Sequence, residues 1–207
     1  MTRSGLALLV VFAASAARAD RREVFIQAEA GLGVQLLTDA ATAAKPGTGL
    51  GVGAQLHVFY GLTNSLHVGG YARGFFAPDV SFVDVTPTLA DGSKPTGTLY
   101  ENAFGAGGGA LVRWRFDTGF SLAPFVQLEL GVAWARFEKL QLIPTAKTFG
   151  IDLPLVDEIA PDGRAVVGLE YRLGERFLIS LHLGGRRSLN RVSQWQLDVA
   201  LAAGVVL

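Results

Sequence analysis

The feature that most constrains this chain is an alternation of apolar residues with polar or glycine residues, which recurs in eight segments. In residues 65–76, SLHVGGYARGFF, one face carries Leu66, Val68 and Phe76 and the other carries His67 and Arg73. Successive side chains of a β-strand point to opposite faces, so a period of two over this length favours strand over helix. We therefore predict strands at residues 23–36, 49–60, 65–76, 100–116, 120–136, 164–173, 177–186 and 194–207.

The connections between these segments also alternate. Short turns are predicted near residues 61–63, 117–119 and 174–176, and long links at 37–48, 77–99, 137–163 and 187–193. This order fits an all-β fold, an eight-stranded antiparallel up-and-down barrel with both termini on the short-turn side. The second and third long links are rich in apolar residues, so they either extend the strands beyond a membrane or cover a binding surface.

The apolar face of the segments fits lipid better than water. It carries no charged residue in any segment as drawn, and a charge that faces lipid at mid-bilayer costs about 2–4 kcal/mol. The other face is rich in glycine, which makes room for bulky side chains inside a narrow barrel. Aromatic residues gather at the segment ends, as in the interfacial girdles of transmembrane barrels. The predicted girdle residues are Tyr60, Trp114, Phe116, Phe120, Tyr171 and Phe177 beside the short turns, and Phe76, Tyr100, Trp134 and Trp195 toward the long links.

The first residues have the order of a secretory signal peptide. Arg3 precedes an apolar run from Leu6 to Ala14, and Ala17-Arg18-Ala19 provides a small-residue cleavage site after residue 19. We therefore expect a signal peptide at 1–19 and a single exported domain at 20–207. Lysine plus arginine equals aspartate plus glutamate, 18 of each, so the net charge indicates no nucleic-acid partner. The absence of cysteine excludes disulfides, thiolate metal sites and thiol nucleophiles.

On this pattern of strands, turns and links, the chain resembles the small eight-stranded outer-membrane β-barrels of Gram-negative bacteria, the group that includes the OmpA transmembrane domain, OmpX and OmpW. The resemblance implies location in the outer membrane, with membrane lipid and the barrel-assembly machinery as partners. One departure is visible. Such barrels usually end in an aromatic residue, whereas this chain ends Val205-Val206-Leu207.

The inward face carries the candidate functional residues. The predicted lumen charge network is Glu29, Arg73, Glu101, Arg113, Glu129, Arg164, Glu170, Arg172, His182, Arg186 and Asp198. Charges in a low-dielectric interior need partners, so a plug of salt bridges is one interpretation. The other is a narrow or gated pore whose charges select ions, since eight strands leave too little bore for a wide porin channel.

Two further constellations have residue types suited to other chemistry. His57 and His67 flank the first short turn and would face each other if Tyr60 pairs with Asn64, but no third metal ligand is evident. Ser180 and His182, with Glu170 on the adjacent segment, have the residue types of a hydrolytic triad, although they point into the barrel. We expect a packed polar interior rather than a metal site, a cofactor or an enzyme.

The sequence thus predicts an outer-membrane barrel with a largely plugged polar lumen and a structural or surface-interaction role, in which the long loops contact an extracellular ligand. The alternatives are a channel for small or hydrophobic solutes of the OmpW kind, a lipid A-modifying enzyme, and a secreted soluble barrel that binds an apolar ligand.

Overall fold

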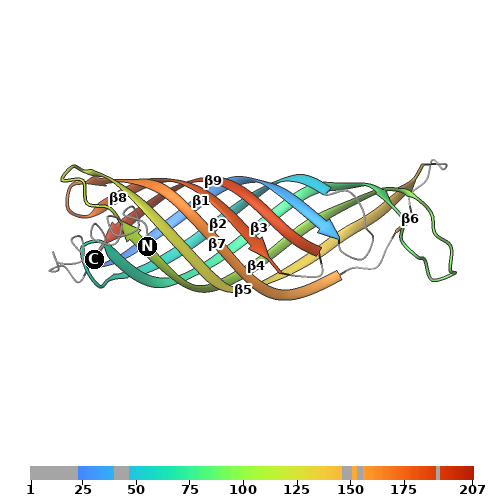
Figure 1. The fold of residues 1–207 in the computed structure, drawn as a ribbon, viewed down its shortest axis with the longest axis horizontal. Helices are drawn as coiled ribbons and strands as arrows, with labels where there is room; N and C mark the ends of the chain where they lie inside the picture. The colour runs from blue at the N-terminus through green and yellow to red at the C-terminus, as the bar shows by residue number, and fades with distance from the viewer. Residues whose placement is uncertain (1–22, 40–46, 146–150, 153–155, 190–191) are drawn as a thin grey trace, which may run out of the picture.

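The computed structural model describes residues 23–39, 47–145, 151–152, 156–189 and 192–207, and the predicted signal peptide lies outside them. The described residues form eight long strands and one two-residue strand, which Figure 1 labels. Their bounds are β1 Val24–Asp39, β2 Gly47–Gly61, β3 Leu66–Val85, β4 Gly97–Arg115, β5 Leu122–Pro144, β6 Ile151–Asp152, β7 Val156–Leu173, β8 Phe177–Ser188 and β9 Val192–Val206.

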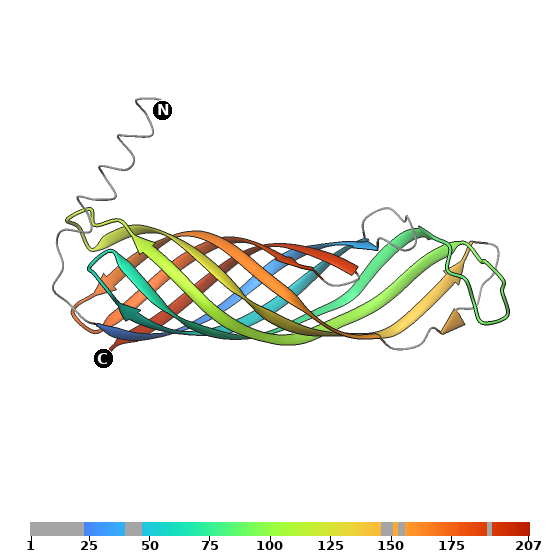
Figure 2. The ribbon, with the colours of Figure 1, turned by 60° about the horizontal axis from the view of Figure 1, so that its bottom comes forward.

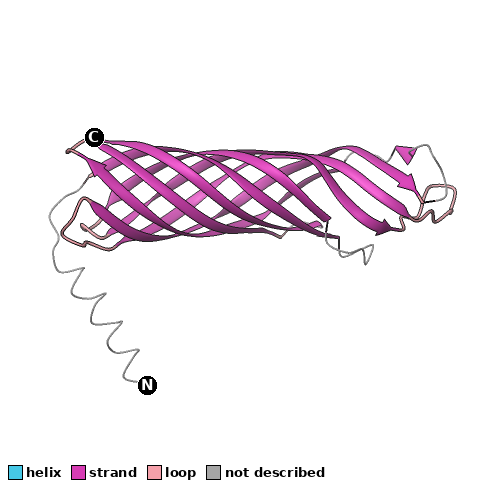
Figure 3. Ribbon diagram, turned by 90° about the horizontal axis from the view of Figure 1, so that it is seen from above, coloured by secondary structure: helices cyan, strands magenta, loops and turns pink. Residues whose placement is uncertain are grey.

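The eight long strands close into an antiparallel barrel, which confirms the predicted fold class. Each strand pairs with its neighbours in the order β4-β3-β2-β1-β9-β8-β7-β5, and a further pairing of β4 with β5 closes the ring. The described residues form strands and loops (Figure 3). They include no helix that is long and apolar enough to cross a bilayer.

The strands are strongly staggered. When paired residues are followed around the barrel, Leu122 of β5 leads to Tyr171 of β7 and then to Ile179 of β8. The path continues through β9, β1, β2, β3 and β4 and returns to β5 at Val132, ten residues nearer the long-link end than Leu122. For eight strands this stagger corresponds to a tilt of about 40° from the barrel axis. Paired residues on neighbouring strands therefore differ in height along the barrel axis. The partner lies about 3 Å nearer the long-link end at each step from β5 to β7 and from β7 to β8.

Both described chain ends lie at the short-turn end of the barrel, as predicted (Figure 2). The backbone N–H of Gly61, at the end of β2, donates to the carbonyl of Glu23, and that of Leu207 donates to Val24. Gly119 and Gly174 occupy the two other short turns with φ of 73° and 68°, a left-handed conformation that glycine adopts without steric cost.

Two of the predicted long links are wrong in their boundaries. Strand β3 continues to Val85 and β4 begins at Gly97, while β5 continues to Pro144 and β7 begins at Val156. Strands β3, β4 and β5 therefore rise beyond β1, β2, β8 and β9 as a lobe (Figures 1 and 2). A buried apolar cluster on the inner side stabilises this end, so the apolar residues of these predicted links that the structure describes lie largely on extended strands. Its members are Phe75, Ala77, Val80, Phe82, Val85, Ala103, Ala135, Phe137 and Leu142.

The period of two separates the two faces of the wall as expected. Along β8 the exposed residues Phe177, Ile179, Leu181 and Leu183 alternate with buried Leu178, Ser180 and His182. One prediction about the outward face is wrong. Arg136 lies on it, at the end of the predicted segment 120–136, and its Nε lies 3.1 Å from Glu138 Oε1 and 3.7 Å from Asp157 Oδ1. The stretch of β5 beyond Trp134 therefore leaves the apolar belt.

Candidate functional site

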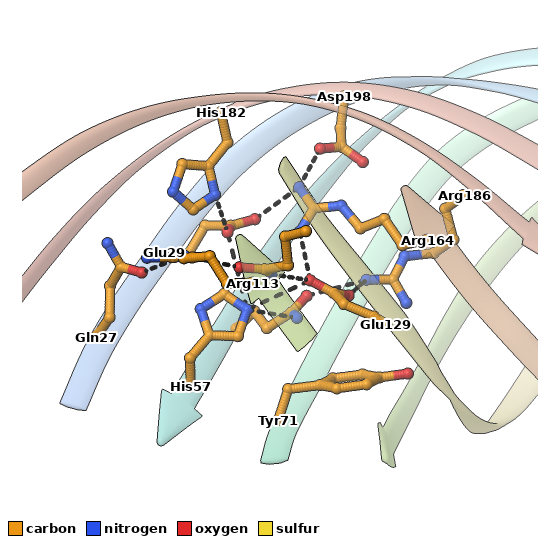
Figure 4. Close-up of polar contacts among 12 residues, drawn as sticks. Gln27, Glu29, His57, Tyr71, Arg113, Glu129, Arg164, His182, Arg186 and Asp198 are labelled. Atoms are coloured by element: carbon orange, nitrogen blue, oxygen red, sulfur yellow. Dashed lines mark hydrogen bonds and ion pairs between the residues drawn. The ribbon is translucent and has the colours of Figure 1, made fainter. Parts of the chain in front are cut away.

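The centre of the lumen holds a network of buried ion pairs (Figure 4). Glu129, from β5, accepts from Arg164 Nη1 at 3.3 Å through one carboxylate oxygen and from Arg186 Nη2 at 2.9 Å through the other. Arg164 also reaches Glu29 Oε1 at 2.8 Å and Asp198 Oδ1. Because these residues come from five strands, β1, β5, β7, β8 and β9, the network ties the walls of the barrel together.

Asp162 is a second centre of the network, and sequence reasoning missed it. Arg73 Nη2 donates to its Oδ1 at 3.1 Å, Arg186 Nη1 donates to Oδ2 at 2.5 Å, and the Ser188 hydroxyl donates to Oδ1 at 2.7 Å. The predicted long link 137–163 includes Asp162, which therefore was not assigned to the inward face. Asp162 and Arg164 are two residues apart, so on a strand they lie on the same face. Continuing the alternation upstream of Arg164 would therefore have assigned Asp162 to the lumen.

Ser180 and His182 have a carboxylate partner, but it is not the predicted Glu170. The Ser180 hydroxyl lies 2.8 Å from Nε2 of His182, and Nδ1 of His182 lies 2.6 Å from Oε2 of Glu29. Gln27 Nε2 donates to the Ser180 hydroxyl at 2.5 Å. Glu170 is indeed opposite Ser180 in the β7–β8 register, but its carboxylate turns toward arginines nearer the short-turn end. Ser180 is 1% exposed and His182 is 0% exposed, so solvent does not reach this chain of contacts.

Below the central network, Arg113 lies fully buried in the lumen against aromatic rings. Its guanidinium carbon lies 4.2 Å from the ring centre of Phe59 and 4.3 Å from that of Phe125, and the side chain is fully buried. The guanidinium donates to Gln127 Oε1 at 2.7 Å, Glu170 Oε2 at 3.1 Å and Gln27 Oε1 at 2.8 Å. A buried charge is tolerated when its hydrogen bonds are satisfied and a counter-charge is present, and both conditions hold here.

Some predicted network residues lie elsewhere. Arg172 pairs with Glu23 at 2.7 Å near the short-turn rim, away from the central charges. Glu101 is buried on β4 next to the register shift that begins the lobe. His57 and His67 do not face each other, because the β2–β3 register pairs His57 with Tyr71 and His67 with Gly61. Tyr60 pairs with Val68 and not with Asn64, so the condition for the two histidines to face each other is not met. No group of three or more His, Cys, Asp or Glu among the described residues is arranged to hold a metal.

A small cavity remains within the charged network. It has a volume of about 30 Å³, and its lining includes Glu29, Arg73, Arg164, Arg186 and Asp198. This volume accommodates about two water molecules, and the polar lining suits water. The cavity is nearer the long-link end than the fully buried Arg113 layer, so polar groups above this layer are slightly more exposed than those within it.

Inward glycines provide the space that the large lumen side chains fill, as predicted. A Cβ atom at Gly131 would lie 2.2 Å from the backbone oxygen of Gly108 and 2.8 Å from the hydroxyl of Tyr71, and one at Gly168 would lie 2.3 Å from Cζ of Phe125. Side chains do not approach so closely without displacement, so these positions require glycine to keep the rings where they are.

The outward aromatic residues at the short-turn end are half-buried or exposed on the barrel surface. They are Tyr60, Trp114, Phe116, Phe120, Tyr171 and Phe177. At the other end Phe76 is paired with Phe104, and the ring centres of Phe104 and Trp134 lie 5.7 Å apart. Tyr100 lies further along β4, beyond a register shift, and the side chain of Trp195 is outside the described residues.

The distance between the two aromatic levels matches a bilayer. Leu122, whose partner on β7 is the girdle residue Tyr171, and Trp134 are twelve residues apart on β5. At about 3.3 Å per residue and a tilt of about 40°, they differ in height by about 30 Å. This is close to the hydrocarbon thickness of a typical bilayer, about 30 Å. The outward residues between the two levels are mostly Leu, Val, Ile, Ala and Gly.

Comparison with known proteins identifies the fold. No protein-family model and no curated protein sequence matches the chain. The barrel is similar to the crystal structure of Neisserial surface protein A (NspA), with a TM-score of 0.52 and 11% identity over 86% of this chain and 95% of that one. The N-terminal β-barrel domain of Pseudomonas aeruginosa OprF is also similar, with a TM-score of 0.44 and 15% identity over 90% of this chain and 100% of that domain. The chain thus has the fold of the small eight-stranded outer-membrane β-barrels, as its sequence pattern predicted.

Proposed function

We propose that this protein is exported with a cleaved signal peptide at 1–19 and resides in the outer membrane as a barrel of residues 20–207. The short turns face the periplasm and the lobe of β3, β4 and β5 projects outward. Support comes from the apolar outer wall, the two aromatic levels about 30 Å apart, and a fold shared with a Neisserial surface protein. Insertion by the barrel-assembly machinery and contact with outer-membrane lipid are part of this proposal.

The lumen in this proposal is a plug rather than a conduit. The carrying observation is the Arg113 layer, where the guanidinium lies between Phe59 and Phe125 and is 0% exposed. The ion pairs above it join β1 to β9, β5, β7 and β8 and leave space for about two waters. Such an ion-paired interior stabilises the closed barrel and offers no continuous aqueous path.

Function then lies at the lobe, with a structural or surface-interaction role. The buried cluster around Phe82 and Leu142 makes the lobe a folded surface, and its other side presents Val83, Tyr100 and Ile143 with 40–49% exposure. An extracellular ligand would meet this surface. A hydrolytic role is disfavoured because the side chains of Ser180 and His182 are buried in the lumen and not accessible to a substrate. The second candidate is a narrow channel for small or hydrophobic solutes, favoured by the cavity next to Arg73 and Arg164.

Single-channel conductance of the refolded 20–207 chain in a planar bilayer separates the two candidates. The plug predicts no conductance steps from the wild type. Arg113→Ser removes the side chain that fills the lumen and should produce small discrete steps, whereas Arg172→Ser at the rim should stay silent. Gel mobility with and without heating verifies that each variant is folded. Discrete steps from the folded wild type would reject the plug and favour the channel.

A further inference from the structure

The turn between β7 and β8, at the short-turn rim, carries two charges of opposite sign. Glu175 and Arg176 are consecutive residues of this turn, both are exposed, and neither side chain has an ion-pair or hydrogen-bond partner among the described residues. Arg172, at the same rim, instead pairs with Glu23 at 2.7 Å. The turn therefore presents an available cation beside an available anion.

The register places these charges at the edge of the apolar belt. Leu122 leads through Tyr171 to Ile179, so Ile179 lies about 6 Å nearer the long-link end than Leu122. Phe177 is two residues closer to the turn and lies within about 1 Å of the level of Leu122. Arg176 is the next residue, so it lies where hydrocarbon meets the headgroups.

An apolar groove of the outer wall begins beside this turn. Its lining includes Leu173 and Phe177, the paired residues on the two sides of the turn, and Leu207. The backbone N–H of Val206 donates to the carbonyl of Arg176 at 2.8 Å. The turn therefore lies directly against this end of the groove.

The groove crosses the strands obliquely and ends near the middle of the belt. Ala28 and Ala203 are paired neighbours in its lining, and their small side chains leave a depression between Leu56 on one side and Ile179 on the other. Three interstrand steps lead from Ile179 to Leu56 and add about 9 Å, so the groove reaches about 15 Å above the level of Leu122. This is half of the hydrocarbon thickness of about 30 Å, the depth of one leaflet.

We infer that this part of the wall is a phospholipid site, in which one acyl chain lies in the groove and the headgroup contacts Arg176 and Glu175. A guanidinium recognises phosphate through charge-assisted, paired hydrogen bonds. The carboxylate beside it suits a headgroup that also carries an ammonium group, and it disfavours a purely anionic one. We therefore assign phosphatidylethanolamine as the occupant. The inference rests on the proposed function for its orientation, in which the short turns and this leaflet face the periplasm.

Native mass spectrometry of the refolded protein, released from micelles that contain phosphatidylethanolamine or phosphatidylglycerol, tests the headgroup contacts. The wild type should retain phosphatidylethanolamine in preference to phosphatidylglycerol. Arg176→Gln should weaken retention of phosphatidylethanolamine about fivefold, the effect of one charged contact at a membrane surface. Glu175→Gln should abolish the preference between the two lipids. Lys94→Gln removes an exposed charge at the opposite end of the barrel, between β3 and β4, and should change nothing.

Two outward alanines test the groove in the same assay. Ala203→Leu fills the depression and should weaken retention of phosphatidylethanolamine. Ala110→Leu makes the same change at an exposed position of β4, four strands away around the ring and outside the groove, and should leave retention unchanged. Gel mobility with and without heating verifies that each variant is folded.

Equal retention by the wild type and Arg176→Gln, or an equal loss in Lys94→Gln, overturns the site, and equal losses in the two Ala→Leu variants overturn the groove. Stronger retention of phosphatidylglycerol by the wild type, or a preference that persists in Glu175→Gln, overturns phosphatidylethanolamine as the occupant. Protease digestion of intact cells is the separate check on orientation. Cleavage between β3 and β4 from outside shows that the proposed function holds even if the lipid site fails, and protection there shows that the proposed orientation itself is wrong.

Discussion

A methyl group at position 184 tests how tightly the lumen network is packed. A Cβ atom at Gly184 would lie 2.7 Å from Nε of Arg164 and 2.8 Å from Oδ1 of Asp198. Gly185, the next residue of β8, faces outward, and an added Cβ there meets only Leu197 Cδ2, at 3.7 Å. The pair of variants therefore makes the same Gly→Ala change on the two sides of one wall.

The expected difference in stability follows from these distances. The atoms around Gly184 must move by more than half an ångström to reach van der Waals contact, and Arg164 cannot move freely because Glu29, Glu129 and Asp198 hold it. Overpacking of a dense interior costs about 1–3 kcal/mol. Alanine gains about 0.4–1 kcal/mol over glycine through the unfolded chain, equally at both positions. Gly184→Ala should therefore be about 1–3 kcal/mol less stable than Gly185→Ala.

Urea unfolding in detergent micelles, followed by tryptophan fluorescence, measures both free energies of unfolding. Gly185→Ala should equal or exceed the wild type in stability, and Gly184→Ala should fall below it. If the two variants unfold with the same free energy, the ion pairs around Arg164 are not packed against the β8 wall, and the account of a filled lumen is wrong.

Arg113→Leu should lower the free energy of unfolding by about 3–5 kcal/mol, because it leaves Glu170 short of a buried counter-charge; a loss below 1 kcal/mol in the same urea assay would contradict this. Asp162→Asn should cost at least 2 kcal/mol by uncoupling two buried arginines, whereas Asp157→Asn at the exposed end of β7 should cost less than about 1 kcal/mol, and equal costs would remove Asp162 from the network. Mass spectrometry of the protein purified from membranes should give a first residue of Asp20, and retention of residues 1–19 would refute the signal peptide.

Much of the fold was predictable because a strand has a period of two. Alternate residues of a strand lie on opposite faces, so the sequence alone assigned Glu129 to the buried face and Leu130 to the exposed one. Strand ends were predicted less well. Beyond Phe76 and Trp134 the outward face ceases to be uniformly apolar, and the register shifts between β3 and β4 interrupt the alternation. Asp162 was missed because β7 begins at Val156, eight residues before the predicted segment 164–173.

The sequence by itself determined the two faces of the wall, the number of long strands and the end at which the chain termini lie. Only the tertiary structure decided which inward charges meet, because pairing across a lumen depends on the stagger accumulated from strand to strand. A stagger of ten residues around the ring brings Glu29 of β1, rather than the adjacent Glu170, to His182 of β8. The structure likewise decided the register of the β2–β3 hairpin, which pairs His57 with Tyr71 and His67 with Gly61 and so keeps the two histidines apart.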